Sequence, residues 1–141
     1  MRKYLAFLIV FVFAAISAAL ASDVHITPDQ IPANAKSFIK ENFPGTTIIK
    51  AKKDYDDGEI EVRLSNGVKI EFRASGEWKE IDGNGNDLSG KYIPAKILSN
   101  VRANHPGVMI EEVHRHFGGH YEIELINDVK LYYNQDGTPA Y

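Results

Sequence analysis

Four of the five histidines lie within sixteen residues of one another, with a spacing suited to metal binding. They are His105, His114, His116 and His120. His114 and His116 alternate along an expected strand, which puts both imidazoles on one face, a spacing that zinc or copper uses. If Gly118-Gly119 forms the hairpin turn, His120 pairs with Phe117 and faces away from the other two. Two interpretations stay open: a metal site at His114 and His116, or exposed histidines at the end of a strand.

The segment Asp82-x-Asn84-x-Asn86-Asp87 resembles the start of a calcium-binding loop, in which oxygen ligands alternate along the chain. It departs from such a loop at two positions. Asp87 stands where the loop needs glycine, and Ile93 stands where a bidentate glutamate should close the site. A flexible polar linker accounts for the same residues.

Signatures of catalysis are missing from the sequence. There is no cysteine, no Gly-x-Ser-x-Gly and no His-Glu-x-x-His. Carboxylates are plentiful, but they alternate with apolar residues, as they should on the exposed side of a sheet. They include Glu59, Glu61, Glu71, Glu122 and Glu124. We therefore expect a protein that is not an enzyme and needs no cofactor.

Two helices are predicted to support these residues. Residues 32–43 carry apolar side chains at helical spacing, with Pro32 in the first turn and Pro44-Gly45 as the stop. A second helix begins at Pro94 and stops at Pro106-Gly107. Each helix presents one apolar stripe, which must pack on another layer.

Strands with strict alternation follow each helix. A hairpin around Ser65-Asn66-Gly67 is predicted from the alternation in residues 60–64 and 68–72. A second hairpin is predicted from residues 121–125 and 129–133. A further strand precedes each hairpin, within residues 46–55 and 108–117, and residues 77–81 add a fourth to the first set. The matching segment 138–141 is short and contains Pro139, which argues against a regular strand. Trp78 is expected to pack at the sheet end or between the halves.

The chain repeats itself, and the repeat defines its organisation. Ile31-Pro-Ala and Asn42-x-Pro44-Gly45 return 62 positions later as Ile93-Pro-Ala and Asn104-x-Pro106-Gly107. We expect an α+β protein of two tandem repeats, each a helix followed by three or four antiparallel strands, with both helices on one sheet face. The repeats span 22–81 and 92–141 and form one domain. The Gly/Asn-rich linker 82–91 leaves open whether they share one sheet or hinge as two halves.

Residues 1–21 read as a signal peptide, with Arg2 and Lys3 ahead of an apolar stretch and a small-x-small site at Ala19-Leu20-Ala21. Export predicts a periplasmic or secreted protein without a membrane span once the signal is removed. The mature chain then keeps 14 basic side chains against 19 acidic ones, a net charge of −5. Since its lysines and arginines are not clustered, nucleic acid is not an expected partner.

The order of these motifs is similar to that of a known family. The Ile-Pro-Ala start, the Asn-x-Pro-Gly stop, the Asn66-Gly-Val hairpin and Gly76-x-Trp-Lys-Glu-Ile-Asp82 resemble the secreted PepSY-like proteins, whose fold is similar to a tandem-repeat β-lactamase inhibitor. The resemblance implies an exported α+β protein without enzymatic activity that binds another protein. It transfers no inhibitory residue, because its motifs are turns and helix ends.

The solvent-facing side of the sheet is the preferred functional surface. Tyr132 and Ile126 stand in the second repeat where the first has Glu71 and Ser65, and exposed aromatic and branched residues suit a protein-binding patch. The predicted partner-binding residues are Arg63, Lys69, Glu71, Glu122, Lys130 and Tyr132. We expect a non-enzymatic, inhibitor-like binding module for an envelope or extracellular protein. The alternative is a metal- or small-ligand-binding module using the strand of His114, His116 and His120.

Overall fold

A computed structural model describes residues 23–140, and the predicted signal peptide lies outside them. The described chain is α+β, with two helices and a single sheet of eight antiparallel strands in chain order. The strands are β1 (Asp23–His25), β2 (Ile48–Asp54), β3 (Ile60–Leu64), β4 (Lys69–Phe72), β5 (Trp78–Asp82), β6 (Ile110–Arg115), β7 (Tyr121–Leu125) and β8 (Lys130–Tyr133). None of the described helices has the length and hydropathy needed to span a membrane.

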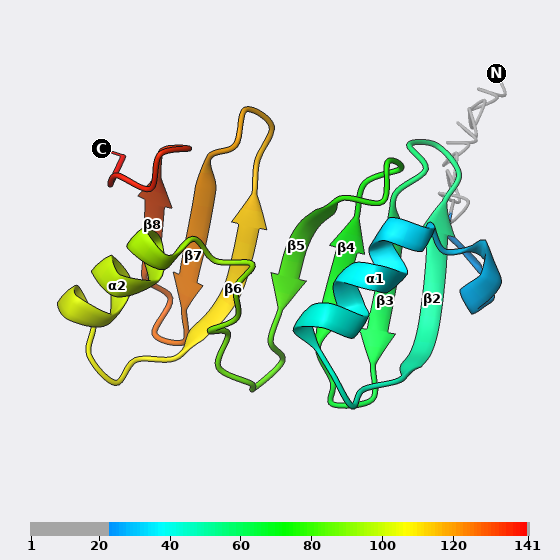
Figure 1. Ribbon diagram of the computed structural model, residues 1–141, viewed down its shortest axis with the longest axis horizontal. Helices are drawn as coiled ribbons and strands as arrows, with labels where there is room; N and C mark the ends of the chain where they lie inside the picture. Colours follow the sequence, from blue (N-terminus) through cyan, green and yellow to red (C-terminus); the bar gives the residue numbers. More distant parts are fainter. Residues whose placement is uncertain (1–22, 141) are drawn as a thin grey trace, which may run out of the picture.

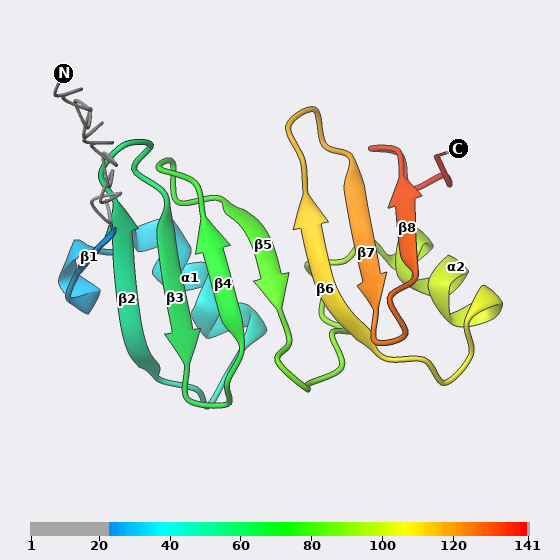
Figure 2. The same cartoon turned by 180° about the vertical axis from the view of Figure 1, so that it is seen from behind.

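Both α-helices cover the same face of the sheet, in front of it in Figure 1 and behind it in Figure 2. They are α1 (Ala33–Asn42) and α2 (Ala95–Asn104), and a short 3-10 helix spans Pro28–Gln30. The residue before each α-helix is a proline, Pro32 or Pro94, whose fixed φ suits a helix start. Each helix buries two apolar side chains of its stripe and leaves its polar side to solvent.

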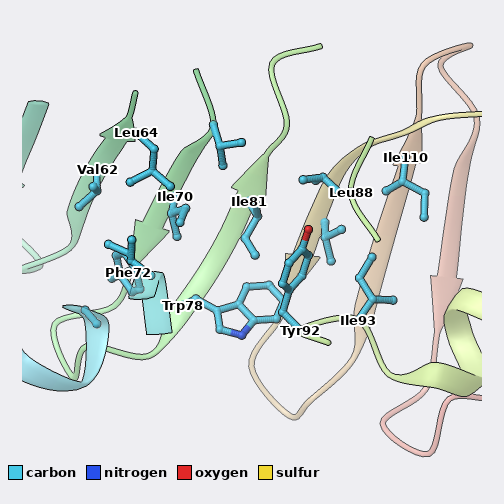
Figure 3. Close-up of a cluster of buried hydrophobic side chains, with 14 of the residues drawn as sticks. Val62, Leu64, Ile70, Phe72, Trp78, Ile81, Leu88, Tyr92, Ile93 and Ile110 are labelled. Atoms are coloured by element: carbon cyan, nitrogen blue, oxygen red, sulfur yellow. The ribbon is translucent and has the colours of Figure 1, made fainter. Parts of the chain in front are cut away.

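One hydrophobic core fills the space between helices and sheet (Figure 3). Strand residues of the predicted inward set are fully buried, such as Val62, Ile70, Phe72, Ile123 and Leu125. Burial of a large aliphatic side chain is worth about 1.5–3 kcal/mol, so this layer supplies most of the folding free energy. The period-2 pattern in the sequence identified these positions correctly.

The two halves join into one sheet through β5 and β6. Ile81 pairs with Val113 across this junction, and Asp82 pairs with Glu112. The segment expected to be a flexible linker is tied to the fold, since Leu88 is buried and its N–H donates to the Ile110 carbonyl at 3.1 Å. The question of one sheet or two hinged halves is thus answered in favour of one sheet.

Three local features differ from the sequence prediction or add to it. β1 is an additional edge strand, paired with β2. The expected pairing of Phe117 with His120 is wrong, because the His116 N–H donates to the His120 carbonyl at 2.8 Å. The chain therefore turns through three residues, and Gly118 and Gly119 both adopt positive φ. At the C-terminus an isolated bridge joins Tyr133 to Pro139 in place of a ninth strand.

Candidate functional site

The face of the sheet opposite the helices, here called the outer face, is built from two rows of side chains. Cross-strand partners lie on the same face of a sheet, so the strand register defines each row. The first row runs Lys52, Glu61, Glu71, Glu80, His114, Glu122, Tyr132. The second runs Lys50, Arg63, Lys69, Asp82, Glu112, Glu124, Lys130. Almost every position carries an ionisable group, and none is buried.

The six residues predicted to bind a partner all belong to these rows, but they form two groups. Arg63, Lys69 and Glu71 lie on β3 and β4, whereas the other three lie on β7 and β8. Adjacent strands are about 4.8 Å apart, so β5 and β6 separate the two groups by roughly 14 Å. A single small ligand would not touch both groups, while the face of another protein would.

Many charged side chains of the outer face form ion pairs with one another. In the second half, Lys130 Nζ lies 3.2 Å from Glu122 and 3.0 Å from Glu124. In the first half, Lys79 Nζ lies 2.6 Å from Glu59 and 3.3 Å from Glu71. Burial, together with the hydrogen bond to Glu59, raises the pKa of Glu71. In residues 23–140, Arg63 makes no ion pair and is exposed, which leaves it available to a partner.

His114 lies at the centre of the outer face, between two carboxylates. Its Nδ1 is 3.3 Å from Glu80 on β5, and its Nε2 is 3.1 Å from Glu112 on β6. The hydrogen bond to Glu80 is the main reason that the pKa of His114 rises to about 9. The imidazole is therefore a cation at neutral pH and balances the acidic centre. Sequence reasoning missed Glu80 as a partner, because that contact depends on the register across the junction of the halves.

Two sets of three potential ligands in residues 23–140 have their ligand atoms within 4.8 Å of one another. They are Glu80, Glu112 and His114, and His114, Glu122 and Glu124. His116 belongs to neither set and contacts Glu122 at 3.1 Å, although its ring stacks with that of His114 at a centroid distance of 6.1 Å. His120 lies across the hairpin turn and is exposed. The geometry thus groups His114 with glutamates rather than with the two other histidines.

The calcium-like segment uses its side chains to fasten turns. The Asp82 carboxylate accepts the Asn84 N–H at 2.7 Å. Both carboxylate oxygens of Asp87 accept a hydrogen bond, one from the Ile110 N–H at 2.7 Å and the other from Arg102 Nη2 at 2.7 Å. These contacts tie the segment to α2 and β6, which explains the aspartates and asparagines in structural terms.

Comparisons with known proteins agree with this architecture. A family model described as "Putative beta-lactamase-inhibitor-like, PepSY-like" matches residues 20–63 and 58–139. The chain is 30% identical to a "putative calcium-regulated periplasmic protein" from Bacteroides thetaiotaomicron, with a TM-score of 0.77, covering 84% of this chain and 94% of that one. A "putative periplasmic protein of unknown function" from Bacteroides vulgatus is 28% identical, with a TM-score of 0.76 over 84% of this chain and 97% of that one.

Another "putative periplasmic protein" from Bacteroides vulgatus is 27% identical, with a TM-score of 0.75, and the alignment covers 86% of this chain and 97% of that one. No protein of curated function matches the chain. Since the similar structures come from periplasmic proteins, the chain is an exported protein, periplasmic or secreted. The chain belongs to the PepSY-like family.

Proposed function

We propose that this protein is a non-enzymatic module of the cell envelope that binds another exported protein on its outer face. The observation that carries the proposal is the uncovered face itself. It continues across the sheet from β1 to β8, while both helices lie on the other side (Figures 1 and 2). Antiparallel sheets often leave one face to solvent, but this one displays Tyr132, which is 49% exposed, beside charged rows.

On this proposal, the two halves are repeats of one helix-plus-sheet unit, over residues 22–81 and 92–141. Together they present a single continuous binding surface. Its contact area would exceed what either half offers alone. Binding free energy would come mainly from Tyr132 and from Arg63, which forms no ion pair within residues 23–140, since aromatic and arginine side chains dominate protein interfaces. The paired charges, such as Lys130 with Glu122, would select the partner and its orientation. The family description makes inhibition of a bound enzyme one form this binding would take.

The test is capture of partners from envelope extract by the tagged mature chain, residues 22–141. The binding variant carries alanine at Arg63, Lys69, Glu71, Lys130 and Tyr132. The matched control carries alanine at five exposed helix residues: Lys36, Ser37, Lys40, Glu41 and Lys96. Like the binding variant, it removes three positive charges and one negative charge. We expect one partner to be retained by the wild type and the control and lost by the binding variant, whose circular dichroism spectrum should stay native.

Recovery of the same proteins with all three chains would contradict the proposal. It would show that the outer face is only solvated and that capture depends on other surfaces. Because interface alanine substitutions at dominant positions cost about 2 kcal/mol or more, loss in the binding variant should be nearly complete.

A divalent cation at His114 is a second candidate, favoured by the two ligand sets around this residue. The similar protein from Bacteroides thetaiotaomicron is described as calcium-regulated, which adds calcium to zinc as an ion to test. Carboxylate oxygens suit calcium, and an imidazole with two carboxylates suits zinc. This site differs from the one predicted from the sequence, because the ligands beside His114 would be glutamates instead of His116.

The cation is tested by thermal melting of the chelator-treated mature chain with added zinc or calcium. A ligand at about 100 times its Kd stabilises the native state by about 2.7 kcal/mol, which raises the melting temperature by several degrees. The shift should vanish in His114→Gln, because His114 is the residue that both ligand sets share, and it should persist in Glu111→Gln, a neighbouring residue outside both sets. No shift with either ion in the wild type would eliminate this candidate.

A further inference from the structure

A cleft of about 450 Å³ lies at one end of the sheet, away from the centre of the outer face. It is formed where three segments meet: the β4–β5 turn, the β6–β7 turn and the residues that follow β8. These segments lie at the upper end of the sheet in Figure 1. Both halves of the chain therefore contribute to the cleft.

Two arginines from different halves converge on the cleft wall. Arg73 Nη1 donates to the Trp78 carbonyl at 3.3 Å, and Arg115 Nη2 donates to the same carbonyl at 3.1 Å. Arg73 Nη2 also donates to the carbonyl of Arg115. The shared acceptor fixes the two guanidinium groups side by side.

Among the described residues, neither arginine forms an ion pair. Within residues 23–140, no carboxylate oxygen lies within 4.0 Å of either guanidinium, although the chain has 19 acidic residues. Arg73 Nε is buried and has no hydrogen-bond partner among these residues. Two adjacent partly desolvated cations repel each other, and an anion placed between them would remove this cost.

Each guanidinium group makes a cation–π contact with an aromatic ring. Arg73 lies 4.6 Å from the centroid of the Phe117 ring, and Arg115 lies 4.9 Å from that of Trp78. Stacking on a ring restrains a guanidinium without using its N–H groups. Within residues 23–140, Arg115 donates only through Nη2, so its Nε and Nη1 remain available to a ligand. Phe117 is 83% exposed, and with Tyr121 it forms an apolar border of the cleft.

We propose that the cleft between Arg73 and Arg115 binds a carboxylate that stands next to an apolar or aromatic group. The C-terminal residue of a peptide and a free acylated amino acid both have this chemistry. The planar carboxylate can accept two parallel hydrogen bonds from Nε and Nη1 of Arg115 and lies close to the charge of Arg73, whereas the neighbouring side chain packs on Phe117. Glu77 at the cleft border counts against polyanions, because it would repel additional negative charge.

The experiment titrates the mature chain with N-acetylphenylalanine and with its amide, following the fluorescence of Trp78, the only tryptophan. We expect the acid to bind at least about tenfold more tightly than the amide, a difference of about 1.4 kcal/mol. A peptide ending in phenylalanine, with a free or an amidated C-terminus, distinguishes the two sources. Tighter binding of the free peptide than of the acylated amino acid indicates a peptide site, and equal affinity indicates a single-residue ligand.

Variants connect binding to the cleft. Arg115→Lys keeps the charge but removes the bidentate edge, and Phe117→Ala removes an exposed ring that folding does not need. Both should weaken binding of the acid about tenfold, while Lys40→Gln, which removes an exposed positive charge on α1, should leave it unchanged. Equal binding of acid and amide, equal competition by inorganic phosphate, or unchanged affinity in both cleft variants would overturn the proposal.

Discussion

Replacing Trp78 by alanine is expected to lower the free energy of unfolding by about 3–5 kcal/mol. Trp78 is 6% exposed and lies on β5, the last strand of the first half. Its ring stacks on Phe38 of α1 at a centroid distance of 6.1 Å. It also meets Tyr92 and Tyr121 of the second half, each at 6.3 Å (Figure 3 shows Trp78 beside Tyr92). Its removal opens a cavity at the junction and takes away contacts from both halves at once.

Urea unfolding followed by far-ultraviolet circular dichroism measures this loss, since the variant has no tryptophan fluorescence. The matched control is Tyr55→Ala, because Tyr55 is 61% exposed and should change stability by no more than about 0.5 kcal/mol. A domain of this size is stable by only about 5–15 kcal/mol, so the expected loss is a large share of the total. A change below about 1 kcal/mol for Trp78→Ala would show that the halves do not depend on this packing.

The second large effect is a pH-dependent contribution of His114 to stability. Its pKa is raised from 6.5 to about 9, mainly by the hydrogen bond to Glu80. A raised pKa means that the native state binds the proton more tightly than the unfolded state. The stabilisation is therefore complete below pH 6.5, and it is lost as the pH rises to about 9. Allowing for partial solvent exposure, we expect the loss to be on the order of 2 kcal/mol.

The measurement compares the wild type with His114→Gln by urea unfolding in chelator at about pH 6, about pH 7.5 and about pH 9.5. The stability difference should be largest at the lowest pH and close to its minimum at the highest. His120→Gln serves as the control, because His120 is exposed and no carboxylate in residues 23–140 lies within ion-pair distance of it. A difference between wild type and His114→Gln that stays constant across this range would contradict the assignment.

Local sequence patterns were sufficient to predict most of the individual elements. Alternation along residues 60–64 and 121–125 identified buried positions, and the proline and Pro-Gly signals delimited both helices. Trp78 was expected to pack at the sheet end or between the halves, and its contacts confirm this. These features depend on spacing within a short segment, which a single sequence contains in full.

The missed features depend on contacts between distant segments or on choices that the residues leave open. The pairing of Glu80 with His114 joins strands separated by a whole helix, so no local pattern encodes it. Gly118-Gly119 permits both two-residue and three-residue turns, and the longer one forms. β1 has only three exposed residues, too few for a recognisable alternation. The cleft arginines are similarly invisible in sequence, because Arg73 and Arg115 meet only after the sheet is assembled.

Binding through the outer face is the central claim, and site-specific photo-crosslinking tests it most directly. A benzoylphenylalanine placed at position 132 of the mature chain and irradiated in envelope extract should crosslink one partner. The same group at Ser99, an exposed position on α2 behind the sheet, should not crosslink that partner. Crosslinks to one partner from position 132 alone are the result we predict. Equal crosslinking from both positions, or capture of the partner only from position 99, would contradict the account.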